Sequence, residues 1–198
     1  MKSLPLAAIA AFALAALPAT AEAGKSNSVT VGVPQIVWPA LHAEYERKLL
    51  RKVSVGAFAS AGQYDPFIIK LAMGDSAGPT SGLNMRAFGL RANLFAIGGF
   101  KHGLILGLTG RWGRLSTSAD GGELPDVTLE VGSALYGTHL GYKLIVKPGI
   151  TVSMLGGIGY HKFGDVTVTA GPVSGSEDLF ADMPPVATYG TINAGWSF

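Results

Sequence analysis

Apolar residues alternate with small or polar residues through most of this chain. In GLILGLTGRWGR (103–114), one face of an extended strand carries leucine and tryptophan, while the other carries mostly glycine, threonine and arginine. The segments 87–96, 150–161 and 186–198 alternate in the same way. A period of two positions places successive side chains on opposite faces of a strand. The pattern therefore predicts a protein built from β-strands that each have one apolar face.

Short joints alternate with longer connections between these strands. The short joints are LLRK at 49–52, GGFKHG at 98–103 and VKPG at 146–149, and the longer connections are expected at about 63–82, 115–126 and 163–185. Short turns at one rim and long loops at the other are typical of outer-membrane β-barrels. These joints delimit an odd number of segments, whereas a closed antiparallel ring needs an even number.

The first segment, residues 29–48, resolves this parity. Pro34 and Pro39 interrupt it, and proline is poorly tolerated inside a strand. We therefore predict strands at 28–33 and at about 40–48, which makes eight strands with both chain ends at the short-turn rim. The alternative is an amphipathic helix, because apolar residues also recur every four positions in LHAEYERKLL. We favour the strand because it supplies the even number.

The segment 127–145 needs one irregularity. Its apolar residues at 127–131 fall in one register, and those at 136–144 fall in the opposite register. A β-bulge adds one residue and reverses the alternation. We predict a bulge near 132–135, which would bring both sets to the same face.

The N-terminus indicates export from the cytoplasm. Lys2 precedes an apolar run from Leu4 to Leu17, and small residues lead from there to Ala23. These are the parts of a cleaved secretory signal peptide. The run is also shorter than the ~20 residues that a membrane-spanning helix needs. We expect a signal peptide over residues 1–23 and a barrel domain over residues 24–198.

Composition supports a membrane barrel more than a soluble domain. Charged residues make up 14% of the chain and hydrophobic residues 48%, and there is no cysteine. The charged fraction is well below the roughly 25% of soluble domains. A barrel accommodates many apolar residues without a long apolar run, because they occupy alternate positions of many strands.

Four stretches resemble a known family: the signal peptide, LHAEYERKL followed by a turn and VSVGAFASAG, the hairpin GYKLIVKPGITVSMLGGIGY, and the terminal WSF. Together they resemble a small bacterial outer-membrane β-barrel protein of the OmpA/OmpX-like kind, over nearly all of the mature chain. The resemblance implies an all-β, eight-stranded, antiparallel up-and-down transmembrane β-barrel. It also implies a location in the outer membrane of a Gram-negative bacterium.

The resemblance also implies partners. The final strand, with Ile192, Trp196 and Phe198 on one face, resembles the signal by which the barrel-assembly machinery recognises its clients. The expected partners are that machinery, outer-membrane lipid and lipopolysaccharide. We expect a monomer that binds no nucleic acid.

The opposite strand faces predict a polar interior. The residues that we expect in this network are Glu44, Glu46, Arg91, Arg111, Lys143, His161 and Asn193. Glu130 and His139 are further candidates. Because an eight-stranded interior is just wide enough for side chains to fill, acids and bases should pair across it. Arg91 and Arg111 with Glu44 and Glu46 are the central candidates for this pairing.

Motifs for catalysis or metal binding were sought and not found in the sequence. The four histidines form no HxxxH pair, there is no cysteine for a zinc site, and no GxSxG or phosphate-binding loop occurs. We therefore expect no cofactor and a non-enzymatic barrel with a structural or surface-interaction role, its lumen filled by polar side chains. The alternative is a narrow channel or transporter for a small or apolar solute. A lipid A-modifying barrel enzyme is third, because no serine stands close to His161.

Overall fold

The structure is a computed structural model. It describes residues 25–32, 40–64, 83–119, 127–170, 172–177 and 185–198. Nine antiparallel β-strands make up this part of the chain. The strands are β1 (Asn27–Gly32), β2 (Ala40–Leu50), β3 (Val53–Tyr64), β4 (Leu83–Gly99), β5 (His102–Ala119), β6 (Val127–Ile145), β7 (Ile150–Ala170), β8 (Val173–Glu177) and β9 (Val186–Ser197). The predicted signal peptide lies outside the described residues. No helix in the described ranges is long and apolar enough to cross a membrane.

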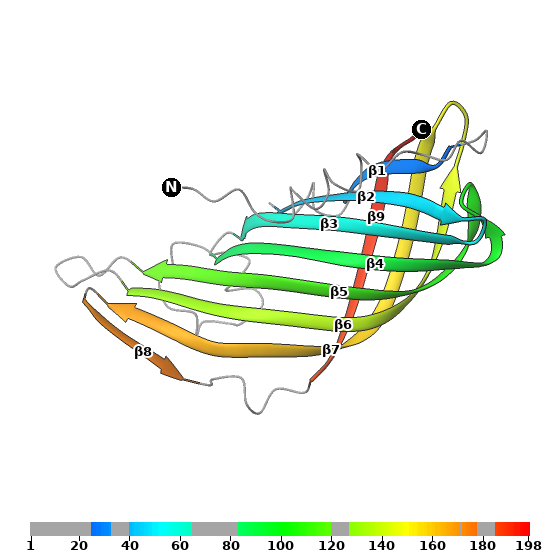
Figure 1. Cartoon of the computed structure of the whole chain (residues 1–198). Helices are drawn as coiled ribbons and strands as arrows, with labels where there is room; N and C mark the ends of the chain where they lie inside the picture. Colours follow the sequence, from blue (N-terminus) through cyan, green and yellow to red (C-terminus); the bar gives the residue numbers. More distant parts are fainter. Residues whose placement is uncertain (1–24, 33–39, 65–82, 120–126, 171, 178–184) are drawn as a thin grey trace.

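Eight of these strands close a ring, so the predicted up-and-down barrel is confirmed. Strands β1 to β6 pair in sequence order, β6 pairs with β7, β7 with β9, and β9 with β1. Figure 1 shows the short turns gathered at one end of the molecule. At the closing seam, the backbone nitrogen of Phe198 donates to the Asn27 carbonyl oxygen at 2.9 Å. Both ends of the described barrel therefore meet at the short-turn rim.

The strand at 40–48 is also confirmed, and the alternative of a helix there is wrong. Strand β2 pairs with β1 on one side and with β3 on the other, from Ala40 to Leu50. Its alternate residues His42, Glu44 and Glu46 are buried on the inner face. A helix would have left one edge of each neighbouring strand without backbone partners and would have spread these polar side chains around its surface.

Strands β7 and β8 differ from the expectation of a long loop over 163–185. Strand β7 continues to Ala170, and β8 folds back to pair with its outer part, from Val166 to Ala170. The threonine and valine residues at 166–169 favour extended structure. The extension therefore forms a hairpin beyond the closed ring.

The irregularity predicted in β6 lies in β7 instead. The pairing of β6 with β5 is continuous from Leu144 to Val127. Against β7, the register shifts between Val131 and Ser133. The two residue steps from Val131 to Ser133 on β6 lie opposite the three steps from Val166 to Phe163 on β7. The extra residue is therefore on β7, and β6 keeps a single alternation along its whole length.

As a consequence, the apolar residues at 127–131, at the long-loop end of β6, point into the barrel and not outward as expected. Val131 pairs with Leu115 of β5, which shares the inward face with Thr109, so Val127, Leu129 and Val131 also belong to the inward side. Glu130 points outward, where its carboxylate lies 3.4 Å from the Arg114 guanidinium. Beyond the apolar band of a barrel, the outer face no longer has to be apolar, which removes the reason for a bulge in β6.

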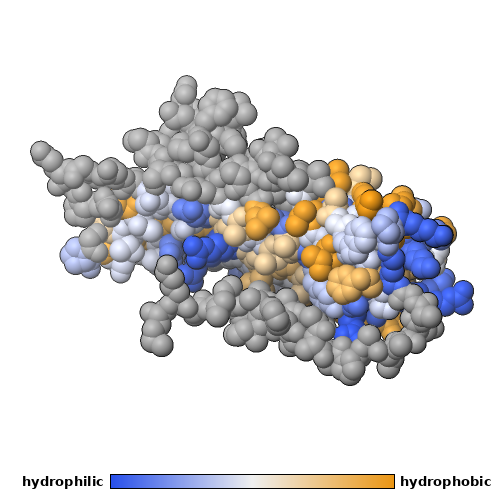
Figure 2. All heavy atoms as spheres, turned by 90° about the horizontal axis from the view of Figure 1, so that it is seen from above, coloured by the Kyte–Doolittle hydropathy of each residue, from blue (hydrophilic) through white to orange (hydrophobic). Residues whose placement is uncertain are grey.

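Apolar side chains cover the outside of the ring. Leu94, Leu106, Leu108, Leu140 and Ile158 all point outward and are each about half exposed or more. In Figure 2, apolar residues occupy the middle of the visible face, and hydrophilic residues gather toward its ends. This distribution suits a barrel whose middle is surrounded by lipid.

A small hydrophobic cluster lies inside the barrel toward the short-turn end. Phe95, Phe100, Ile105 and Leu155 are buried there, with Ile145 packed against them. The Phe95 and Phe100 rings meet edge to face, with centroids 6.0 Å apart. Buried polar side chains adjoin this cluster: Lys143 Nζ lies over the Phe100 ring, and Thr151, the cross-strand partner of Ile145, shares a hydrogen bond with Ser197.

Candidate functional site

Glu44 of β2 anchors one half of a polar network inside the barrel. Nη1 of Arg91, on β4, donates to both of its carboxylate oxygens, at 2.8 and 2.6 Å. Nδ2 of Asn193, on β9, donates to the same carboxylate at 3.0 Å. The His42 ring nitrogen Nε2 lies 3.9 Å away. The carboxylate therefore ties together strands from opposite sides of the closing seam.

Glu46, two residues farther along β2, anchors the other half. Its carboxylate accepts hydrogen bonds from Lys143 Nζ at 2.5 Å and from Asn93 Nδ2 at 2.8 Å. The Ser54 hydroxyl donates to it, and the Ser28 hydroxyl lies 3.4 Å away. Lys143 Nζ also donates to Ser28 at 2.9 Å. Because alternate residues of a strand share a face, Glu44 and Glu46 enter the same lumen at neighbouring levels.

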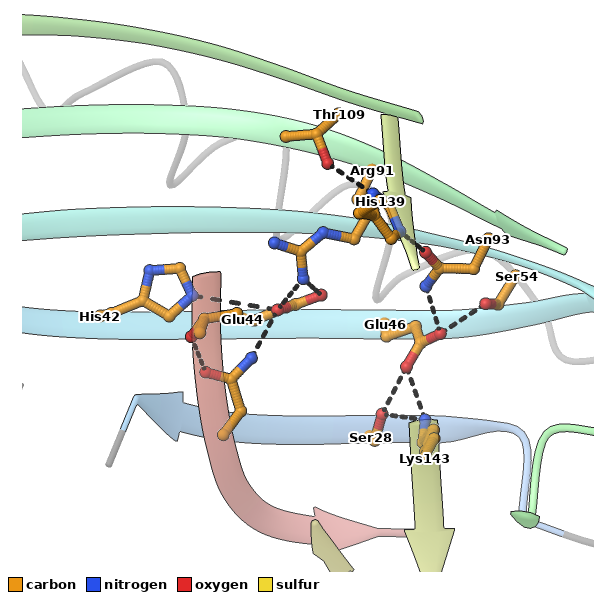
Figure 3. A network of polar contacts seen from close by, with 12 residues as sticks. Ser28, His42, Glu44, Glu46, Ser54, Arg91, Asn93, Thr109, His139 and Lys143 are labelled. Carbon is orange, nitrogen blue, oxygen red and sulfur yellow. Dashed lines mark hydrogen bonds and ion pairs between the residues drawn. The ribbon is translucent and has the colours of Figure 1, made fainter. Parts of the chain in front are cut away.

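His139 of β6 extends the network toward β5. Its Nε2 lies 2.8 Å from the Asn93 side-chain oxygen, and its Nδ1 lies 3.0 Å from the Thr109 hydroxyl. Figure 3 shows these side chains converging on Glu44 and Glu46 from the surrounding strands. Within the described part of the ring, every strand except β7 contributes a residue to these contacts.

The network is buried and balanced in charge. Glu44, Glu46, Arg91 and Lys143 are each less than 10% exposed. Two carboxylates face two cations, and each cation also lies over an aromatic ring: Arg91 is 5.1 Å from the Phe58 centroid, and Lys143 is 3.7 Å from that of Phe100. A buried ion without a partner carries a large desolvation cost. The pairing therefore makes it possible to keep four charged groups inside the barrel.

The structure brings together five of the residues predicted for the interior, namely Glu44, Glu46, Arg91, Lys143 and Asn193. The additional candidate His139 joins them, whereas Glu130 lies outside. Arg111 and His161 point inward nearer the long-loop end and are not part of these contacts. Arg111 Nη2 lies 3.1 Å from Met85 Sδ, and the His161 ring lies 4.2 Å from that of Phe163.

Sequence reasoning did not select the short polar members of the network, which are Ser28, His42, Ser54, Asn93 and Thr109. Each of them lies on the inward face of its strand. The signal that could have found them is this shared facing combined with the pairing register, since Ser54 and Asn93 are direct cross-strand partners. The inward direction of a side chain alone does not show which residues of other strands lie at the same height along the barrel axis.

Gly107 of β5 leaves the space that the His139 ring occupies. A Cβ atom at this position would collide with that ring and with the Ala92 carbonyl oxygen. We expect Gly107→Ala to lower the free energy of unfolding by about 1–3 kcal/mol, because it overpacks the lumen. Gly156→Ala is the matched control, since a Cβ there meets no atom within 4 Å. Urea unfolding of both variants in detergent micelles measures the difference, and equal stabilities would contradict the packing.

The three residues of the predicted assembly signal share the outward face of the chain's end. Ile192, Trp196 and Phe198 are all exposed, and Phe198 is 59% exposed. The Phe198 carbonyl oxygen accepts from the backbone nitrogens of Ser26 and Asn27, at 3.0 and 2.9 Å. In the folded barrel, this segment completes the closing seam.

Comparison with known proteins places the fold. No protein-family profile and no curated protein sequence matches the chain. Among solved structures, it is similar to a major outer membrane protein from Thermus thermophilus, with a TM-score of 0.52 and 12% sequence identity, over 87% of this chain and 98% of the other. It also aligns with Acinetobacter baumannii CarO, with a TM-score of 0.41 and 11% identity, over 87% and 97% of the two chains.

Of the two alignments, only that with the Thermus thermophilus protein supports the barrel fold. At this sequence identity it shows the fold and not the activity. The closed eight-stranded ring, the outward apolar face and the polar interior agree with it. The chain therefore has the fold of the bacterial outer-membrane β-barrel proteins.

Proposed function

We propose that the mature chain is a non-enzymatic integral protein of the outer membrane, with a structural or surface-interaction role and a plugged lumen. The single observation that carries this proposal is the network joining Glu44 to Arg91 and Glu46 to Lys143 across the interior. The apolar outer face supports insertion in a membrane, and the structural similarity supports the outer membrane. Specificity for a surface partner would then come from the long-loop end.

Two groups of side chains occupy the interior. The polar network contains four charged side chains that are held by short hydrogen bonds, and Phe95 and Phe100 lie next to it toward the short-turn end. A hydrated ion would have to displace the matched charges of the network. Separating these charges inside the buried interior is unfavourable.

We expect purified wild-type protein in planar bilayers to show no stable, reproducible conductance. The physical reason is that an eight-stranded lumen has room for its own side chains and little more. Single-channel recording measures this directly. Reproducible unitary currents from a homogeneous preparation would reject the plugged lumen.

A variant can separate a plugged lumen from an inactive preparation. Replacing Arg91 and Glu44 together by alanine removes one matched ion pair without leaving a lone buried charge. If this variant folds and gains ion flux while the wild type has none, the side chains themselves block the path.

A narrow, gated path is the second candidate. Within the described residues, His42 Nε2 and Arg91 Nε are buried without a hydrogen-bond partner. Both belong to the network at Glu44, so a water molecule or a small polar solute in the lumen would find groups to bind. Solute uptake into vesicles that contain the protein, with no electrical current, would support this second candidate over the first.

No observation on the described residues favours the third candidate, a lipid A-modifying enzyme. Incubation of the folded protein with labelled lipopolysaccharide would test for it. Appearance of a modified lipid A species would replace the non-enzymatic proposal.

We also propose that the barrel-assembly machinery recognises the final strand. An exposed strand edge can bind an open sheet edge by β-augmentation, with side chains supplying selectivity. Deleting Phe198 should lower the folded yield in cells far more than it lowers refolding in detergent. Val186→Ala, at an exposed position near the other end of β9, is the matched control. Unchanged cellular assembly without Phe198 would assign that ring to anchoring at the membrane interface.

A further inference from the structure

The short-turn rim carries a cluster of exposed cations. Arg51 and Lys52 form the turn between β2 and β3, Lys101 lies between β4 and β5, and Lys147 lies between β6 and β7. All four residues are exposed. We call them the basic rim.

Backbone contacts link these turns into one continuous surface. The Lys52 carbonyl oxygen of the first turn accepts from the backbone nitrogen of Phe95, at 2.9 Å, close to the second turn. The Lys101 carbonyl oxygen accepts from the backbone nitrogen of Ile145, at 2.6 Å, close to the third turn. Lys25 donates to the Pro148 carbonyl oxygen in that third turn and adds another cation beside it. The positive charges therefore belong to one end of the barrel.

The acids described in the structure lie elsewhere. Glu44 and Glu46 are buried and matched inside the lumen, while Glu130, Asp165 and Glu177 lie toward the long-loop end of their strands. None of the described acids lies in the three short turns. In the sequence, the remaining acids of the mature chain also fall in the longer connections. The two ends of the barrel thus differ in charge.

Exposed apolar side chains stand directly beside the basic rim. Leu50 precedes Arg51 and is 65% exposed, Ile97 precedes the second turn and is 69% exposed, and Val146 precedes Lys147. Long basic side chains next to a lipid-facing apolar surface extend their charged ends to the membrane–water interface. The order of residues in each turn therefore places the cations at the level of lipid headgroups.

We propose that the basic rim binds anionic phospholipid headgroups of the membrane leaflet next to the short turns. The inference rests on the proposed membrane location. It follows from charge complementarity together with the apolar residues that border each turn, since a soluble polyanion would need no such border. A cluster of lysine and arginine at a membrane surface attracts acidic lipids, and the attraction is screened by salt.

The test compares lipid binding by the folded, full mature protein and two double variants. Arg51→Gln with Lys101→Gln removes two charges of the basic rim. Arg86→Gln with Lys162→Gln is the matched control, because it removes one arginine and one lysine from exposed positions toward the other rim. Native mass spectrometry in micelles would count bound phosphatidylglycerol and, separately, bound phosphatidylcholine.

We expect wild-type protein to bind phosphatidylglycerol in preference to phosphatidylcholine, and the rim variant to lose about five-fold in that preference for each charge removed. The control should keep its preference, and raised salt should weaken the preference of the wild type. An equal preference for the two lipids, or an equal loss in the control, would overturn the proposal. Rim-dependent binding of isolated peptidoglycan without a lipid preference would overturn it in favour of a cell-wall polymer.

Failure of this inference can be told apart from failure of the barrel proposal. Heat-dependent gel mobility reports whether each protein is a folded barrel before lipid is added. A folded wild-type barrel that shows no lipid preference would reject only the basic rim as a lipid site.

Discussion

Replacing Arg91 by methionine is expected to lower the free energy of unfolding of the barrel by about 3–5 kcal/mol. Arg91 donates to both oxygens of Glu44, and both side chains are buried. Methionine fills a similar volume but carries no charge, so the buried Glu44 carboxylate would remain without its cation. Urea unfolding followed by tryptophan fluorescence would measure the change.

An exposed ion pair on the same barrel provides the control. Arg114 lies 3.4 Å from Glu130, with side chains that are 70% and 45% exposed. Because water solvates both partners, Arg114→Met should cost only about 0–1 kcal/mol. In addition, Glu44→Gln should restore much of the stability of Arg91→Met by removing the lone charge. Equal losses at Arg91 and Arg114, without rescue, would show that the buried pair does not stabilise the fold as described.

The second large effect is expected on the outer face. Leu106→Arg should lower the stability of the inserted barrel by about 2–4 kcal/mol, because it places a charge among lipid chains. Leu106 is 45% exposed on the outward side of β5 and pairs there with Leu94 and Leu140, which are also outward. Folding yield and unfolding in lipid vesicles would measure the loss.

Ser116→Arg is the matched control on the same strand and the same face. Ser116 pairs with Glu130, at the level where charged residues already occur outside the barrel. Arginine near the interface should cost about 0–1 kcal/mol. Equal assembly of the Leu106 and Ser116 variants in vesicles would contradict the position assigned to the apolar band.

Local patterns were sufficient to predict most of the strands and their facing. Alternation in 103–114 correctly directed Leu106 and Leu108 outward, because the two-residue period of a strand is a property of the backbone itself. The need for an even number of strands also favoured the strand over the helix at 40–48, since a closed ring of antiparallel strands cannot contain an odd number of them. The β6 bulge was wrongly placed, because the sequence of one strand does not reveal where its partner carries an extra residue.

By itself, the sequence determined which side chains face the interior of this protein: Glu44, Glu46, Arg91, Lys143 and Asn193 all follow from strand alternation. Only the tertiary structure decided that Arg91 binds Glu44, that Lys143 binds Glu46, and that Arg111 stays outside this network. The physical reason is that the level of each residue along the barrel depends on the register between strands, and register is set by ring closure over the whole sheet. Facing is local and can be read along one strand, whereas the partner of a buried charge depends on strands far away in the sequence.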